Sequence, residues 1–124
     1  MKILVVDDSK LARMAVAKAL SALHPDWTRI EAANADEALA QVKGASPDIA
    51  VFDFNMPGRD GLALAAEVRA LKPALQVAII SANHQQEVID RARAIGAVFL
   101  SKPLTEQALK EFLSGAEAKL KVSQ

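Results

Sequence analysis

The sequence contains no cysteine among its 124 residues. Without cysteine there is no disulfide framework and no thiolate metal site, a pattern typical of proteins in a reducing cytosol. The sequence also lacks an excess of charge of either sign, because Lys plus Arg and Asp plus Glu number 15 each. The net charge therefore provides no general attraction to nucleic acid or to a membrane surface.

Long apolar segments are absent as well. The first apolar run, residues 3–6, ends at two aspartates and is too short for the core of a signal peptide. No segment approaches the roughly 20 apolar residues that a membrane-spanning helix needs. Linkers, repeats and low-complexity tracts are not visible either. We therefore expect a single domain over residues 1–124, located in the cytoplasm and without membrane insertion.

Short apolar runs alternate with helical patterns along the whole chain. The runs predict strands over residues 2–6, 28–32, 48–53, 75–80 and 97–100. The periodicity between them predicts helices over residues 10–23, 34–43, 60–71, 85–95 and 105–119. Because short, continuously apolar strands are typical of a parallel sheet with both faces covered, the pattern predicts a doubly wound α/β fold.

Local signals predict how some helices begin, end and pack. Asn34 and Glu37 have the spacing of a capping box at the start of the second helix, and Gly44 is expected to end that helix. Pro57 and Gly58 predict a turn after the third strand. Helical spacing predicts the buried faces of two helices: Leu11, Ala15, Ala19 and Leu23 in the first, and Leu62, Ala65, Val68 and Leu71 in the third.

Polar side chains follow the predicted strands at their carboxyl ends. Parallel strands all end at the same edge of the sheet, which is where open α/β sheets bind their ligands. The residues expected to share this edge are Asp7, Asp8, Glu31, Asp53, Ser81 and Lys102. Each of them alone has an ordinary interpretation as a helix cap, a solvated loop residue or a surface lysine. Their joint placement favours a functional site.

A cluster of Asp7, Asp8 and Asp53 is electrostatically unfavourable by itself. Two unit charges about 4 Å apart repel by about 4 kcal/mol at an effective dielectric constant near 20. With Lys102 beside them, three negative charges and one positive charge leave a formal charge of −2, which a divalent cation would neutralise. Oxygen ligands favour Mg²⁺ over zinc. A carboxylate, Mg²⁺, a lysine and the Ser81 hydroxyl form a set for phosphoryl transfer, with Asp53 as the nucleophile.

The same residues resemble the receiver domain of bacterial two-component response regulators, particularly the single-domain, CheY-like kind. The resemblance rests on four motifs in order: Val6-Asp7-Asp8-Ser9, then Asp53 followed by Met56-Pro57 and Asp60-Gly61, then Ser81-Ala82, and finally Lys102-Pro103. It covers residues 2–113, which leaves 114–124 as the end of the last helix and a short tail. It implies a flavodoxin-like, five-stranded parallel sheet with the strand order 2-1-3-4-5 and five helices.

The resemblance also implies a role for each motif. Asp53 is expected to accept a phosphoryl group, and Lys102 to contact its oxygens. Mg²⁺ is expected to bind Asp7, Asp8, Asp53 and the backbone carbonyl of Asn55, while Ser81 and Phe99 form the switch. The Lys102–Pro103 peptide bond is expected to be cis, against about 5–6% of X-Pro bonds in folded proteins. Asn55 and Asn83 occupy positions that tune the lifetime of the phosphoryl group in that family.

The partners follow from the resemblance. A histidine kinase or a histidine phosphotransfer protein is expected to donate the phosphoryl group, and a downstream protein target to bind the surface of the fourth helix, fifth strand and fifth helix. The candidate members of this surface are Gln86, Ile89, Arg93, Lys110 and Glu111. Direct binding of nucleic acid is not expected. The protein would catalyse its own phosphorylation and dephosphorylation without being a turnover enzyme.

Other protein classes remain open at this point. A haloacid-dehalogenase-like phosphatase also uses an aspartate with Mg²⁺, but expects Asp-x-Asp after the first strand, where Asp7 and Asp8 are adjacent. A flavodoxin-like cofactor binder expects Ser, Thr and Gly in that loop. A pseudo-receiver usually lacks the acids or the lysine, which are all present. The chain can also be a receiver domain cut from a longer regulator.

Overall fold

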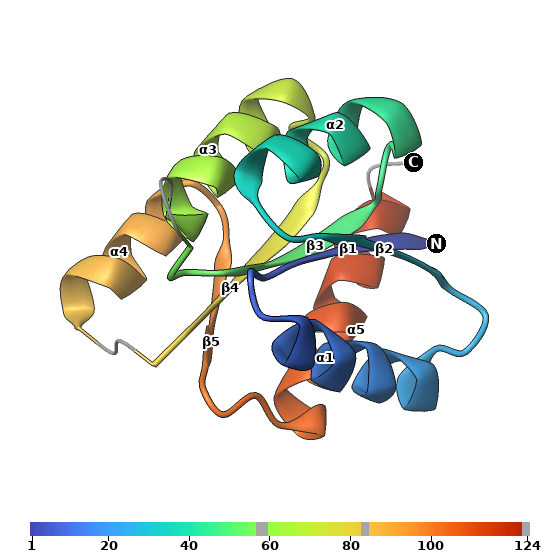
Figure 1. Cartoon of the computed structure of the whole chain (residues 1–124). Coiled ribbons are helices and arrows are strands. Elements are labelled where there is room, and N and C mark those ends of the chain that lie inside the picture. The colour runs from blue at the N-terminus through green and yellow to red at the C-terminus, as the bar shows by residue number, and fades with distance from the viewer. Residues whose placement is uncertain (57–59, 83–84, 123–124) are drawn as a thin grey trace.

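The computed structural model describes residues 1–56, 60–82 and 85–122, and along this part five strands and five helices alternate (Figure 1). The strands are β1 (Lys2–Val6), β2 (Thr28–Ala32), β3 (Ile49–Asp53), β4 (Gln76–Ser81) and β5 (Val98–Ser101). The helices are α1 (Lys10–Leu23), α2 (Ala35–Ala45), α3 (Gly61–Leu71), α4 (Gln86–Ala94) and α5 (Glu106–Val122). Within the described residues, no helix is long and apolar enough to cross a membrane.

The strands form one parallel sheet in the order β2-β1-β3-β4-β5. Ile3 of β1 pairs with Arg29 on one side and with Ile49 on the other, and β3 pairs with both β1 and β4, so β1 and β3 lie in the interior of the sheet. Asp53, the last residue of β3, lies opposite Ile80 of β4. The expected flavodoxin-like order is therefore confirmed, and Asp53 lies at the carboxyl edge of an inner strand.

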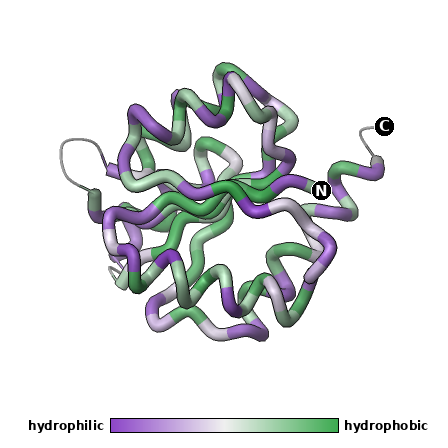
Figure 2. The backbone as a smooth tube through the Cα atoms, turned by 45° about the vertical axis from the view of Figure 1, so that its right-hand side comes forward, coloured by the Kyte–Doolittle hydropathy of each residue, from purple (hydrophilic) through white to green (hydrophobic). Residues whose placement is uncertain are grey.

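Helices cover both faces of the sheet, α2, α3 and α4 on one face and α1 and α5 on the other (Figure 1). Successive strand residues point to opposite faces, so Leu4 and Phe52 pack under the first group of helices while Val5 and Val51 pack under the second. Figure 2 shows the hydrophobic strands running between the two layers. All residues of β3 are buried, which explains why its sequence is continuously apolar up to Asp53.

Side chains cap the predicted helix starts. The side chain of Asn34 accepts a hydrogen bond from the N–H of Glu37 at 2.8 Å, and the Glu37 carboxylate accepts one from the N–H of Ala33 at 2.6 Å. Ser9 and Asp60 cap α1 and α3 in the same way, through their side-chain oxygens. These caps satisfy N–H groups that the first turn of a helix leaves without partners. The capping-box prediction for α2 is confirmed in this form.

The predicted buried face of α1 is only half right, because Ala19 and Leu23 are partly buried against the core whereas Leu11 and Ala15 are exposed. Leu11 is 78% exposed, and the buried residues of the helix are Val16 and Leu20. The sequence offers two stripes at helical spacing, displaced from each other by one residue, or roughly 100° around the helix. The stripe that contains Val16 and Leu20 packs on the sheet, which leaves Leu11 and Ala15 exposed at the surface.

Two smaller predictions are also corrected. Gly44 does not end α2, which continues to Ala45 and stops at Ser46, a residue with a φ of 51° in the left-handed region. Leu71 is 47% exposed, whereas Leu64 is buried on the inner face of α3 together with the predicted Leu62, Ala65 and Val68. Leu71 is the last residue of α3. The turn predicted at Pro57 and Gly58 lies outside the described residues.

Candidate functional site

Three aspartates meet at the carboxyl edge of the sheet. Asp7 and Asp8 follow β1, and Asp53 ends β3, so the pairing of these two strands brings the acids together. Each offers a carboxylate oxygen that lies within 4.8 Å of the others. Asp53 is buried, Asp7 is half-buried and Asp8 is exposed. This arrangement is an open-ended cluster of hard oxygen ligands, with its deepest member on the central strand.

Lys102 reaches the same cluster from the end of β5. Its Nζ lies 2.6 Å from Oδ1 of Asp53, and its side chain is 38% exposed. Oδ1 of Asp53 is buried and forms no well-aligned hydrogen bond with any group of the described residues, so this contact is an ion pair. The backbone N–H of Lys102 donates to the carbonyl of Ser81 at 3.0 Å, which fixes the start of the β5–α5 connection. The peptide bond to Pro103 is cis, as predicted.

Asp7 bears the electrostatic cost of the cluster. Burial raises the pKa of its carboxyl group above the usual range. The negative charge of Asp53 and a hydrogen bond with Asp8 raise this pKa further. The backbone N–H of Ser9, which donates to Oδ1 of Asp7 at 2.9 Å, and the charge of Lys102 act in the opposite direction. The ionised site is therefore under strain that a bound cation would relieve.

The first residue of α3 lies against the main chain of Asp53. A Cβ atom on Gly61 would lie 2.3 Å from the carbonyl oxygen of Asp53 and 3.1 Å from Cα of Phe54. The N–H of Gly61 donates to the carbonyl of Phe54 at 2.9 Å, and the N–H of Phe54 donates to the carbonyl of Ile80 at 2.9 Å. Glycine is therefore required here by the close approach of two main chains, and it helps to hold the residue that carries the central carboxylate.

Arg13 is a site residue that the sequence analysis missed. Its guanidinium group lies between the carbonyl of Asp7 and the carboxylate of Glu31, a residue expected at this edge. A basic residue in the first turn of the helix that follows Asp7 and Asp8 was the available signal. The sequence alone does not tell whether such a side chain turns toward the acids or into solvent.

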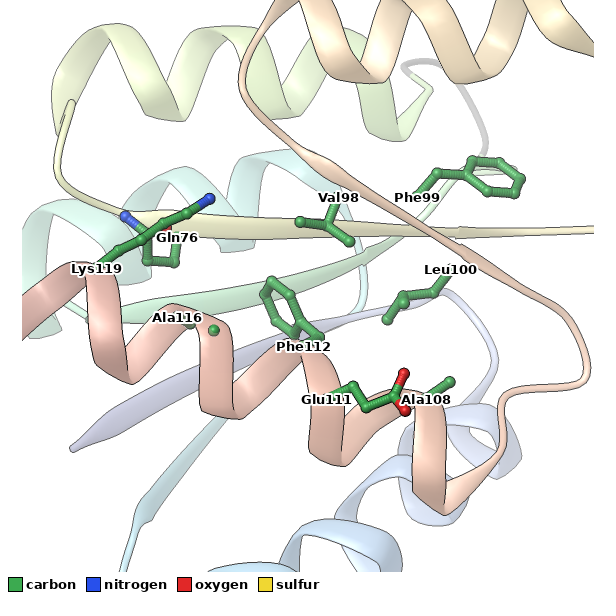
Figure 3. Close-up of a pocket in the computed structure, with 10 residues that line it drawn as sticks. Gln76, Val98, Phe99, Leu100, Ala108, Glu111, Phe112, Ala116 and Lys119 are labelled. Atoms are coloured by element: carbon green, nitrogen blue, oxygen red, sulfur yellow. The ribbon is translucent and has the colours of Figure 1, made fainter.

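The two expected switch residues lie on the strands next to the cluster. Ser81 ends β4 and is fully buried. Phe99 in β5 is partly buried and packs against the core beneath α2, α3 and α4. Figure 3 shows Phe99 on the opposite side of β5 from Leu100, which lies with Phe112 of α5. The predicted metal ligand Asn55 is exposed, and Asn83 lies outside the described residues.

Two grooves adjoin these elements. The first, of ≈ 360 Å³, lies between β5 and α5 and is lined by residues that include Val98, Phe99 and Phe112 (Figure 3). The second, of ≈ 600 Å³, lies between α1 and the β5–α5 connection, and both Asp7 and Lys102 line it. The second groove therefore opens directly beside the acidic cluster.

A family model described as "Response regulator receiver domain" matches residues 3–114. The chain belongs to this family. It is thus a receiver domain of two-component signalling, and the acids, the lysine and the cis peptide bond described above lie within the matched segment.

Proteins of known structure and sequence support the assignment. The chain is similar to CheY4, a chemotaxis response regulator of Vibrio cholerae, with a TM-score of 0.83 and 28% identity over 93% of this chain and 97% of that one. It is similar to the signal receiver domain of NarL from Mycobacterium tuberculosis, with a TM-score of 0.82 and 34% identity over 94% and 95% of the two chains.

Among curated relatives, the positive alginate biosynthesis regulatory protein of Pseudomonas aeruginosa is 34% identical over 121 residues, which cover 94% of this chain and 47% of that protein. The chain spans about half the length, or less, of the curated relatives that it matches. The similarity is therefore confined to the receiver part of those longer proteins.

Proposed function

We propose that this receiver domain, over residues 1–124, accepts a phosphoryl group on Asp53 from a histidine kinase or a histidine phosphotransfer protein and then binds a downstream protein target. The observation that carries the proposal is the buried carboxylate of Asp53, which lies 2.6 Å from Lys102 and within 4.8 Å of the oxygens of two further aspartates. A single ion pair would be enough to hold a buried carboxylate, so the two additional aspartates support a role in binding a ligand. We place this activity in the cytoplasm, in keeping with the absence of cysteine.

The donor set of the cluster fits Mg²⁺. Carboxylate and carbonyl oxygens are the ligands that this ion prefers, and it keeps several water molecules, which suits a cluster with the exposed Asp8 on one side. Asp7, Asp8, Asp53 and the backbone carbonyl of Asn55 would hold the ion. When bound, Mg²⁺ would offset the negative charge of the phosphoryl oxygens during transfer.

The chemical step is a phosphoryl transfer between two side chains. A carboxylate oxygen of Asp53 attacks the phosphorus atom of the donor's phosphohistidine, and an O–P bond forms as the P–N bond breaks. The electron pair of the P–N bond remains on the imidazole nitrogen. Lys102 leaves its ion pair with Asp53 and contacts the phosphoryl oxygens, where its positive charge stabilises the transition state. The chain thus assists its own modification but does not turn over a substrate.

The donor protein would dock on α1 beside the site. Leu11 and Met14 of α1 are 78% and 54% exposed, and because they are three residues apart they are neighbours on the helix surface. The groove of ≈ 600 Å³ continues from α1 past Pro103 to Lys102. A donor helix that covers Leu11 and Met14 would therefore bring a phosphohistidine to the mouth of the acidic cluster.

The signal would leave the site through Ser81 and Phe99. A phosphoryl group adds about −1.5 to −2 of charge and three acceptor oxygens, by analogy with phosphoserine. The Ser81 hydroxyl would be drawn to these oxygens, and Phe99 would turn further inward. Phosphorylation would in this way shift an existing equilibrium between two states of one surface.

The output surface would comprise α4, β5 and α5, and it includes the groove in Figure 3. Of its candidate members, Gln86, Arg93, Lys110 and Glu111 are exposed, and Ile89 is half-buried. Both signs of charge are present, which suits a protein partner better than nucleic acid.

The test is the addition of one phosphoryl group by a small donor. Wild-type protein is incubated with acetyl phosphate and Mg²⁺, and its intact mass is measured. One phosphoryl group should be added to the wild type and to the control Asp48→Asn, an acid at the other end of β3, but not to Asp53→Asn. Equal addition to Asp53→Asn, or no addition to the wild type, would contradict the proposal.

A further inference from the structure

The main chain of Asp7 is held from two sides. Its N–H donates to the carbonyl of Ala32 at 3.2 Å, and its carbonyl accepts from Nη1 of Arg13 at 2.5 Å. Nε of the same arginine donates to Oε1 of Glu31 at 3.1 Å. Because Glu31 and Ala32 are consecutive residues of β2, these contacts close a ring. The ring joins the end of β1, the end of β2 and the first part of α1.

Arg13 is built into this ring. Its side chain is only 15% exposed, compared with 50% for Glu31. A guanidinium group is planar and presents its N–H donors in a fixed fork, so two contacts made through different nitrogens fix both its place and its orientation. Its own N–H donates to the carbonyl of Ser9 at 3.1 Å, which places Arg13 in the turn of α1 that follows the two acids.

We propose that Arg13 is a positioning residue, which holds the segment carrying Asp7 and Asp8 against the end of β2 and thereby strengthens the binding of Mg²⁺ by the acidic cluster. This inference rests on the proposed function, because it concerns the cation site of Asp53. Arg13 acts on the main chain of Asp7 and contacts neither the cation nor the phosphoryl group. Glu31 is the brace that keeps the guanidinium group in place.

The charge of Arg13 should have the opposite effect on Mg²⁺ binding. A positive charge near three carboxylates repels a cation, so the charge of Arg13 alone would weaken the binding of Mg²⁺. If charge dominates, removal of Arg13 tightens Mg²⁺ binding. If positioning dominates, removal loosens it. The sign of the change therefore separates the two roles.

The chain offers a matched control in Arg29. Nη1 of Arg29 donates to the carbonyl of Ala17 and to Oγ of Ser21, both at 2.8 Å. Arg29 thus also ties β2 to α1 through an arginine side chain, but through residues that lie farther along the helix from the acids. Substitution of Arg29 therefore measures the effect of losing a link between β2 and α1 while the contact of Arg13 with Asp7 remains.

The first experiment measures Mg²⁺ binding by isothermal titration calorimetry on the full chain. Arg13→Met and Arg13→Lys should each raise the dissociation constant about tenfold, the lower end of the usual cost of losing a group that orients a metal ligand. Lysine keeps the charge but cannot reproduce the fork, so the two variants should agree. Arg29→Met should stay within about twofold of the wild type. Unchanged or tighter binding by both Arg13 variants, or an equal loss with Arg29→Met, overturns the proposal.

Two further readouts separate positioning from general damage. In the metal-free protein, the amide hydrogens of Asp7 and Ser9 should exchange faster in Arg13→Met than in the wild type, while those of β4 should not change. At saturating Mg²⁺, phosphorylation of Arg13→Lys by acetyl phosphate should return to the wild-type rate. A wild type that binds no Mg²⁺ overturns the proposed function and this inference together. A wild type that binds Mg²⁺ while the Arg13 variants match it overturns this inference alone.

Discussion

The charged groups at the two edges of the sheet have opposite environments. At the amino edge, Asp48 accepts a hydrogen bond from the backbone N–H of Lys2 at 3.0 Å, and the Lys2 ammonium donates to the carbonyl of Ala45 at 3.1 Å. At the carboxyl edge, Asp7, Asp8 and Asp53 crowd together. Charges at the first edge join β1 to the end of α2 and to the residue before β3, whereas like charges at the second edge repel one another.

This difference indicates that the carboxyl edge, and not the amino edge, reduces the stability of the fold. An acid that accepts a hydrogen bond from an N–H group contributes to folding, as Asp48 does. An acid that is partly buried beside other acids reduces stability unless a cation joins it, as the raised pKa of Asp7 indicates. The carboxyl edge is thus prepared for a ligand, and substitutions at the two edges should have opposite effects on stability.

The largest effect is expected from Asp7→Asn. The variant loses a charged ligand, so its affinity for Mg²⁺ should fall about 100-fold, the upper end of the range for groups that support a metal ligand. Its metal-free melting temperature at pH 7 should nevertheless rise, because asparagine removes the repulsion and can still accept from the N–H of Ser9. Calorimetric titration and thermal unfolding measure the two effects. A lower melting temperature would contradict the stated cost of the cluster.

The same residue sets a pH dependence. The pKa of Asp7 is higher in the folded state than in the unfolded state, so the folded state binds the proton more tightly. The stability that this proton contributes is fully present below the unfolded pKa of about 3.9 and is lost as the pH rises through the folded-state pKa. The advantage of Asp7→Asn in melting temperature should therefore shrink toward zero as the pH is lowered to about 4. An advantage that grows at low pH would reverse the sign of this argument.

The next effect is expected from Gly61→Ala. The new methyl group would lie 2.3 Å from the carbonyl oxygen of Asp53, and because both partners are main chain, it should cost about 1–3 kcal/mol of unfolding free energy. The shift of the Asp53 main chain should also weaken Mg²⁺ binding. Gly44→Ala is the control, because Gly44 lies in α2 and a Cβ atom there would have no atom within 4 Å. This substitution should raise the free energy of unfolding by about 0.5–1 kcal/mol. Equal effects of both substitutions on urea unfolding would refute the close approach.

The smallest effect is expected from Asp48→Ala at the amino edge. Loss of the hydrogen bond to the N–H of Lys2 should lower the free energy of unfolding by about 1 kcal/mol. The affinity for Mg²⁺ should remain that of the wild type, because Asp48 precedes the first residue of β3 whereas Asp53 is its last residue. A clear change in Mg²⁺ affinity would show that the two edges are coupled and would weaken the comparison.

The order of the elements and the clustering of the acids were both predictable from the sequence, because both follow from the parallel sheet. Continuous apolar strands imply a parallel sheet, and a parallel sheet gathers every strand end at one edge, so Asp7, Asp53 and Lys102 needed only their positions along the chain. The prediction for the buried face of α1 failed at Leu11 and Ala15 because two stripes of apolar residues satisfy the same period. Only contact with the sheet selects Val16 and Leu20 over Leu11.

The missed contributors depend on distances between elements. Arg13 matters because β2 lies beside the start of α1, and Gly61 matters because α3 begins against the main chain of Asp53. Local sequence carries no measure of either distance. The residues that perform the proposed chemistry were therefore predictable from strand ends, whereas the residues that hold them in place were not.

The single ion pair of Lys102 with Asp53 leaves negative charge in excess at the carboxyl edge. The chain as a whole carries no net charge, yet three carboxylates and one ammonium group leave a formal −2 at this edge. The carboxyl edge is therefore a local negative pole around the reactive site, and it attracts small cations at a rate that falls with ionic strength. A phosphodonor is itself an anion, so it meets a repulsive field until that pole is neutralised. This field favours an order of encounter in which the cation arrives before the donor.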